Sequence, residues 1–80
     1  MNINEMAAAL LTRLNAEEMD LAMRNAGYYD NGLTKVQFLK LTHNGRAQYR
    51  ITYDTGEGQV ESGLVYVSWN AASATFRADI

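Results

Sequence analysis

The chain has 80 residues, with seven basic and nine acidic side chains and a formal net charge of −2 at neutral pH. A chain of this length has material for one hydrophobic core, so we expect a single domain over residues 1–80. The absence of cysteine excludes disulfides and thiolate metal sites and is typical of a reducing compartment, so we expect a cytoplasmic protein. The N-terminus lacks the basic lead of a signal peptide, and the apolar run over residues 6–11 is too short to span a bilayer.

The first part of the sequence predicts a helix that is broken or kinked near Asn15. Apolar residues recur at helical spacing between residues 6 and 14, and again between residues 19 and 26. Asn15 with Glu18 forms a capping-box pattern, Leu14 and Met19 stand where a hydrophobic staple would stand, and Gly27 is placed to end the second segment. The alternative is one continuous helix in which the apolar stripe is interrupted by two glutamates.

A β-hairpin over residues 33–54 is the strongest local signal. Asn44-Gly45 between two strand-forming runs predicts a two-residue type I′ turn, because both residues tolerate a positive φ. Such a turn would place His43 opposite Arg46 and sets the whole register. In that register one face of the hairpin is apolar and reads as core: Val36, Phe38, Ala47, Tyr49, Ile51 and Tyr53.

The other face of the hairpin mixes basic, amide and leucine side chains. Residues 31–53 hold four cations and no acid, whereas the flanking blocks 1–30 and 54–80 each carry a net charge of −3. The hairpin is therefore the basic part of an acidic protein.

Two further strands follow the loop at residues 54–58. The segment from Gln59 to Trp69 is apolar on both faces at its centre, which predicts a central strand covered at least in part on both sides, and Gly63 within it predicts a bulge or a close backbone approach. Ala74 to Ile80 alternate as in a half-buried strand. The predicted fold class is therefore α+β, with the N-terminal helix packed on one face of a three- or four-stranded antiparallel meander.

The sequence does not support catalysis. His43 is the only histidine and has no acid beside it in the chain, so it is poorly placed to act as a base or to build a metal site. The loop at residues 54–58 lacks the lysine of a phosphate loop and the closing glutamate of an EF-hand. We therefore expect no enzyme activity, no cofactor and no metal.

The expected function is that of a small interaction protein, an adaptor, inhibitor or regulator of the kind found among bacterial or phage accessory proteins. Arginine and leucine together are typical of a protein contact and suit an acidic or mixed partner surface, either a foreign protein or the Glu17, Glu18 and Asp20 cluster of a second copy in a homodimer. The alternative function is a nucleic-acid-associated regulator that uses the basic hairpin, and an enzyme ranks third. A face that is simply solvated, with its leucines covered by Trp69 or Val67, stays open as the structural alternative to a binding surface. The predicted partner-binding residues are Leu39, Leu41, Arg46, Gln48, Arg50 and Trp69.

Overall fold

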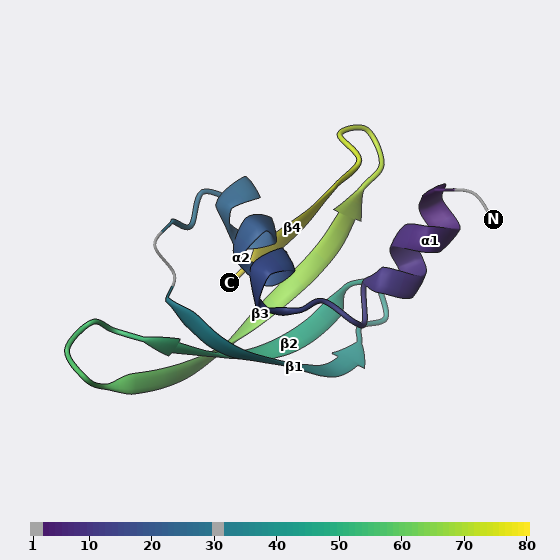
Figure 1. Ribbon diagram of the computed structural model, residues 1–80. Coiled ribbons are helices and arrows are strands. Elements are labelled where there is room, and N and C mark those ends of the chain that lie inside the picture. The colour runs from purple at the N-terminus through teal and green to yellow at the C-terminus, as the bar shows by residue number, and fades with distance from the viewer. Residues whose placement is uncertain (1–2, 30–31) are drawn as a thin grey trace.

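The computed structural model describes residues 3–29 and 32–80, and side chains from residue 5 onward. Two helices, α1 (Ile3–Leu10) and α2 (Ala16–Asn25), precede four strands, β1 (Leu33–Leu41), β2 (Ala47–Asp54), β3 (Val60–Asn70) and β4 (Thr75–Asp79). The strands form one antiparallel sheet in the order β1-β2-β3-β4, which confirms the predicted α+β meander (Figure 1). No helix in the described ranges is both long and apolar enough to cross a membrane.

The two helices are separated at Asn15, as the capping pattern predicts. The Asn15 side chain accepts a hydrogen bond of 2.8 Å from the Glu18 backbone N–H, and the Glu18 carboxylate accepts one of 3.0 Å from the Asn15 N–H. These two bonds satisfy donors that the first turn of a helix leaves unpaired. Gly27 follows the helix with a positive φ of 96°, the left-handed conformation that ends it.

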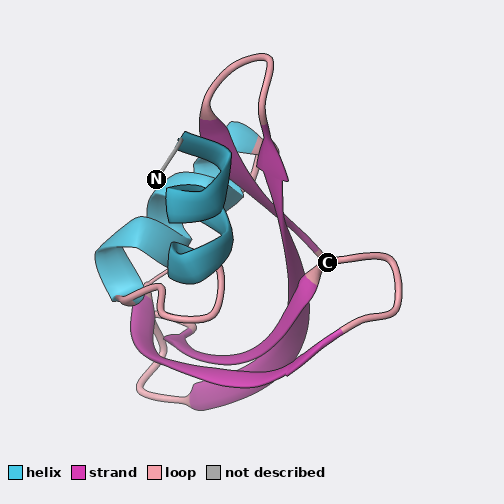
Figure 2. Cartoon of the chain, turned by 90° about the vertical axis from the view of Figure 1, so that its right-hand side faces the viewer, coloured by secondary structure: helices cyan, strands magenta, loops and turns pink. Residues whose placement is uncertain are grey.

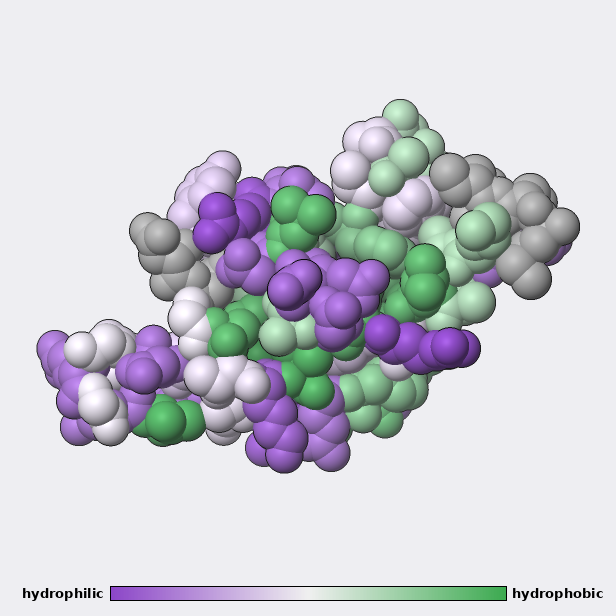
Figure 3. Space-filling view, in the orientation of Figure 1, coloured by the Kyte–Doolittle hydropathy of each residue, from purple (hydrophilic) through white to green (hydrophobic). Residues whose placement is uncertain are grey.

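Both helices lie on the same side of a strongly curved sheet (Figure 2). We call that side the inner face; residues of the linker between the helices and of α2 pack there against residues of β2, β3 and β4. The buried core consists of Leu11, Leu14, Met19, Ala22, Met23, Ala47, Tyr49, Ile51, Val65, Val67 and Ala78. Over α2 the molecular surface is mostly hydrophilic with isolated hydrophobic spots (Figure 3), and Leu21 is an exposed side chain of this helix.

One tyrosine ties the linker between the helices to the middle of the sheet. The Tyr49 side chain is 1% exposed, and its hydroxyl donates a hydrogen bond of 2.7 Å to the Leu11 carbonyl. The same oxygen accepts a hydrogen bond of 3.0 Å from the Leu14 N–H. Tyr49 therefore fixes both the distance and the direction of the chain between α1 and α2.

The predicted turn of the β1–β2 hairpin is wrong. The loop holds three residues, His43 to Gly45, and it is closed by a 2.7 Å hydrogen bond from the Thr42 N–H to the Arg46 carbonyl. The Thr42 hydroxyl accepts a further bond of 3.0 Å from the Arg46 N–H, so a side chain supplies part of the closure. The two-residue turn would require a positive φ at both Asn44 and Gly45. Gly45 has a positive φ and Asn44 does not, as in a three-residue hairpin loop.

The register of β1 shifts twice more, by one residue between Leu33 and Lys35 and by one between Phe38 and Lys40. Phe38 therefore lies opposite Tyr49, where the predicted register has Ile51. Because loop and bulge together displace β1 by two residues, and the side-chain period of a strand is two, Val36 and Phe38 still lie on the inner face as predicted.

The prediction of a bulge or a close backbone approach at Gly63 is wrong. Gly63 pairs regularly with Ile51, without a bulge, and a Cβ at Gly63 would find only the Tyr53 ring, at 4.0 Å. The predicted central position of β3 is confirmed, because it lies between β2 and β4. Its cover on the face turned away from the helices is partial, since Tyr66 is half-buried there and Leu64 is 41% exposed. We call this side of the sheet, which carries Arg50, Leu64 and Tyr66, the outer face.

Candidate interaction surface

The outer face presents polar and basic side chains in rows that run across the strands. Directly opposed residues share a face, so the pairings fix each row. From one end of the sheet to the other the rows are Lys35, Thr52 and Ser62; Gln37, Arg50 and Leu64; Lys40, Gln48, Tyr66 and Asp79; and then Ser68 with Arg77 beside the loop-closing Arg46.

Tyr66 and Arg46 contact each other on this face. The Arg46 guanidinium carbon lies 5.7 Å from the centroid of the Tyr66 ring, within the range of a cation–π contact. On the same ring, the Tyr66 hydroxyl accepts a hydrogen bond of 3.0 Å from the Gln48 side-chain amide. Both Arg46 and Tyr66 are half-buried, so these contacts hold the guanidinium close to the sheet.

Most of the cations on this face have no acidic partner in the part of the chain that the structure describes. Among the described residues the ion pairs join Arg24 to Asp20 at 2.8 Å and Arg77 to Asp79 at 3.2 Å. The outer-face cations that form no ion pair with any described residue are Lys35, Lys40, Arg46 and Arg50. A group of like charges without counter-charges produces a positive potential that attracts an anionic partner.

A shallow hollow of about 360 Å³ lies where the outer face meets the hairpin loop. Its lining includes the ammonium-bearing Lys40, the imidazole of His43, the Asn44 amide and the Arg46–Tyr66 pair. Within the loop the Thr42 hydroxyl is bonded to the Asn44 side chain, which helps to fix the rim of the hollow.

The structure divides the six predicted partner-binding residues between two faces. Arg46, Gln48 and Arg50 lie together on the outer face, and Leu39 is the extra residue of the bulge, 36% exposed. Two of the six do not lie there. Leu41 pairs with Ala47 and Trp69 pairs with Phe76, so both belong to the side of the sheet that the helices cover.

The physical reasons for these two positions differ. The three-residue loop shifts Leu41 by one position relative to a two-residue turn, and a shift of one moves a side chain to the other face. Trp69 alternates with the buried Val65 and Val67, and its ring packs 5.0 Å from the ring of Phe76, centroid to centroid.

Sequence reasoning missed Tyr66 and Leu64, which occupy the centre of the outer face. The segment around them is apolar at every position, so its alternation does not say which side chains face the core. The flanking residues do indicate the face. Ser62 stands two residues before Leu64 and Ser68 two residues after Tyr66, so all four side chains lie on the same side of the strand, and serines would be poor core residues.

The chain carries no cluster of three or more metal-ligating side chains within residues 3–29 and 32–80. His43 is exposed in the hairpin loop. No protein-family model, no curated protein and no solved structure matches this chain.

Proposed function

We propose that this chain is a non-enzymatic binding protein that engages an acidic protein surface through the outer face of its sheet, in the cytoplasm. The observation that carries the proposal is the group of four cations around the Leu64–Tyr66 centre, which have no ion pair within the described part of the chain and lie on the face that neither described helix covers. An acidic surface with an apolar centre matches this face, since arginine and tyrosine are enriched at the buried cores of protein interfaces.

A foreign protein fits the outer face better than a second copy of this chain. The acidic cluster of α2 is the obvious counter-surface for self-association, but two of its three members already have partners. Glu18 accepts the capping hydrogen bond from Asn15, and Asp20 pairs with Arg24. Only Glu17 would remain for an intermolecular contact, so a homodimer through these groups is not the arrangement we propose.

The test is capture of partners from the source cell with a charge reversal at the centre of the outer face. Arg50 is exposed and has no ion pair among the described residues, so Arg50→Glu should leave the fold intact and repel an acidic partner. Arg13→Glu is the matched control, because Arg13 is an exposed arginine in the linker between the helices. We expect mass spectrometry to find an acidic protein bound to the wild type and to Arg13→Glu, and absent from Arg50→Glu.

Loss of that protein with both variants, or with neither, would contradict the proposal. A thermal melt of each variant belongs to the same experiment. Because both substitutions are at exposed positions, we expect the two midpoints to stay within a few degrees of the wild type.

A second candidate function is binding of single-stranded nucleic acid. Tyr66 is an aromatic ring among basic side chains, and stacking on aromatic rings and on arginine planes is how such proteins hold bases while cations neutralise phosphates. The net charge of −2 opposes this function.

Fluorescence anisotropy with labelled single-stranded oligonucleotides in a salt series tests it directly. For nucleic-acid binding, the logarithm of the affinity should fall linearly with the logarithm of salt concentration, and Tyr66→Leu should weaken binding at every salt concentration. No binding at low salt would exclude this second function and leave the first.

A further inference from the structure

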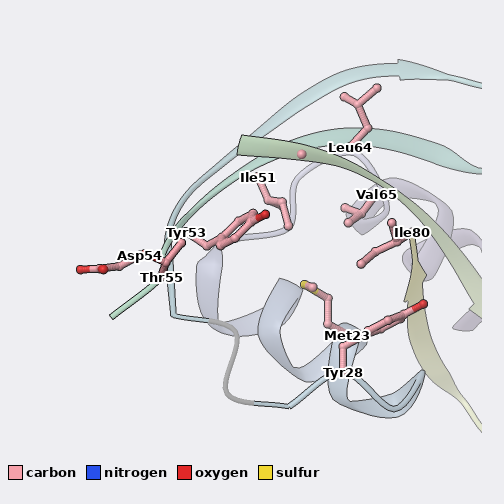
Figure 4. A pocket seen from close by; sticks show the side chains of 10 residues that line it. Met23, Tyr28, Ile51, Tyr53, Asp54, Thr55, Leu64, Val65 and Ile80 are labelled. Carbon is pink, nitrogen blue, oxygen red and sulfur yellow. The ribbon is translucent and has the colours of Figure 1, made fainter. Parts of the chain in front are cut away.

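A second hollow, of about 400 Å³, lies on the inner side of the sheet, away from the basic outer face. It opens between the C-terminal end of α2 and the middle of β2 and β3. Figure 4 shows Met23 and Tyr28 on one side of the hollow and Ile51, Tyr53 and Val65 on the other. Cavities of about 300–1,000 Å³ with mostly apolar walls are typical of small-molecule sites.

The hollow exists partly because β3 has a glycine where a side chain would fill it. Gly63 pairs with Ile51, so a side chain at this position would project from the inner face into the hollow. Neither of the usual reasons for a glycine applies. Its φ is not positive, and a Cβ would meet nothing closer than the Tyr53 Cε1 atom at 4.0 Å.

Glycine in the interior of a strand lowers stability, because the unfolded chain gains entropy and the folded chain loses a packing group. A larger apolar side chain at this position would lie opposite Ile51 on the inner face and would add apolar contact area there. Keeping the hollow open accounts for the glycine, and local backbone geometry does not.

The chemistry of the lining limits what can occupy the hollow. The buried walls are aliphatic or thioether groups of Met23, Ile51 and Val65. The one acidic side chain among the described lining residues, Asp54, points away from the hollow in Figure 4, and its carboxylate oxygen accepts a 2.8 Å hydrogen bond from the Gly56 N–H. An anionic ligand would lose its hydration there without finding an opposite charge, because no cationic side chain is among the described residues that line the hollow, and this is unfavourable.

The Tyr53 hydroxyl is a polar group on the wall of the hollow. The Tyr53 hydroxyl donates a hydrogen bond of 3.3 Å to the Glu61 carboxylate, and its oxygen can still accept a hydrogen bond. We propose that this hollow is a binding site for a small neutral molecule with a hydrophobic body and one hydrogen-bond donor, and that Gly63 keeps the site open.

The test uses N-phenyl-1-naphthylamine, a neutral apolar amine whose fluorescence rises when it leaves water. We expect saturable enhancement with the wild-type protein, and at least tenfold weaker binding by Gly63→Val, whose side chain would occupy the hollow. Ser62→Val is the matched control, because Ser62 is the adjacent exposed residue and lies on the outer face. We expect it to bind the probe as the wild type does.

Two further measurements complete the design. Gly63→Ala adds only a methyl group that has room, so it should fold and bind with intermediate affinity even where the valine is too large. The anionic probe 8-anilinonaphthalene-1-sulfonate should bind at least tenfold more weakly than the neutral probe.

Several outcomes would overturn the inference. They are equal probe affinities for Gly63→Ala and wild type, equal loss with Ser62→Val, or preference for the anionic probe. A change of oligomeric state between wild type and Gly63→Val in sedimentation would also overturn it, because a second copy would then occupy the hollow. The site is independent of the proposed partner surface, so Arg50→Glu should bind the neutral probe normally whether or not it loses its protein partner.

Discussion

Replacing Tyr49 by phenylalanine should remove a large fraction of the stability of this protein. The ring would stay in place, including its edge contact with Phe38 at a centroid distance of 5.6 Å, so the substitution deletes only the hydroxyl. That deletion leaves the Leu11 carbonyl and the Leu14 N–H without their partner at a site where Tyr49 is 1% exposed.

The size of the effect follows from the two hydrogen bonds. A buried donor or acceptor left unsatisfied costs about 1–3 kcal/mol, so two of them give roughly 2–4 kcal/mol, allowing for some access of water to the linker. At about 0.05–0.15 kcal/mol per residue, a domain of this length has roughly 4–12 kcal/mol of stability in total. At the centres of these two ranges, Tyr49→Phe should lower the free energy of unfolding by roughly a third.

Urea denaturation followed by circular dichroism measures this change, and the slope of the unfolding free energy with urea should not change. Tyr66→Phe is the matched control. It removes a hydroxyl that holds one hydrogen bond, to Gln48, on the half-buried outer face, so we expect a loss below about 1 kcal/mol. A loss below about 0.5 kcal/mol for Tyr49→Phe would refute the idea that this hydroxyl fixes the helix linker.

The other predictions concern the core, the helix cap and alkaline pH. Ile51→Ala should cost about 2–5 kcal/mol because Ile51 is 3% exposed, whereas the exposed neighbour Arg50→Ala should be nearly silent in the same urea melt. Asn15→Ala should cost roughly 0.5–2 kcal/mol and shorten α2 at its start, which amide chemical shifts would detect. Burial raises the pKa of Tyr49 above its usual value, with a smaller contribution from Glu18, against the opposing hydrogen bond from Leu14. The folded state therefore holds the phenolic proton more tightly than the unfolded state does. The stability that comes from this protonated tyrosine is complete below about pH 10 and is lost as pH rises through the raised pKa. The urea midpoint of the wild type should therefore fall more steeply above about pH 10 than that of Tyr49→Phe.

The hairpin explains why a face can be predicted correctly from a wrong register. Asn44-Gly45 suits a two-residue turn, but the Thr42 hydroxyl can bond to the Arg46 N–H and so favours the longer loop. That single-residue error places Leu41 on the wrong face. The bulge at Leu39 adds a second shift of one residue, so every residue from Phe38 back to Lys35 returns to the predicted face although its partner differs.

Helix boundaries and sheet faces differed in how far the sequence determines them. The break at Asn15 depends on groups within four residues of each other, so the local pattern was enough. The place of Tyr66 depends on the pairing of β3 with β2, and the apolar segment around it does not by itself distinguish the two sides of the strand. The flanking Ser62 and Ser68 carry the one local signal for its face, and it is weaker than the charge pattern that predicts the cationic character of the outer face.

The two bulges of β1 also bear on how this protein stays dispersed. β1 is nine residues long, largely exposed, and lies at one border of the sheet, where one row of its backbone groups has no neighbouring strand. Such a border invites another chain to add itself as a fifth strand, which is a route to aggregation and amyloid. The bulges interrupt the regular spacing of these backbone groups. If a second copy paired through its own β1, Lys35 and Lys40 would also lie close to the lysines of that strand, and the like charges would repel. The irregularity that misleads a simple register count thus protects the sheet against growth at this border.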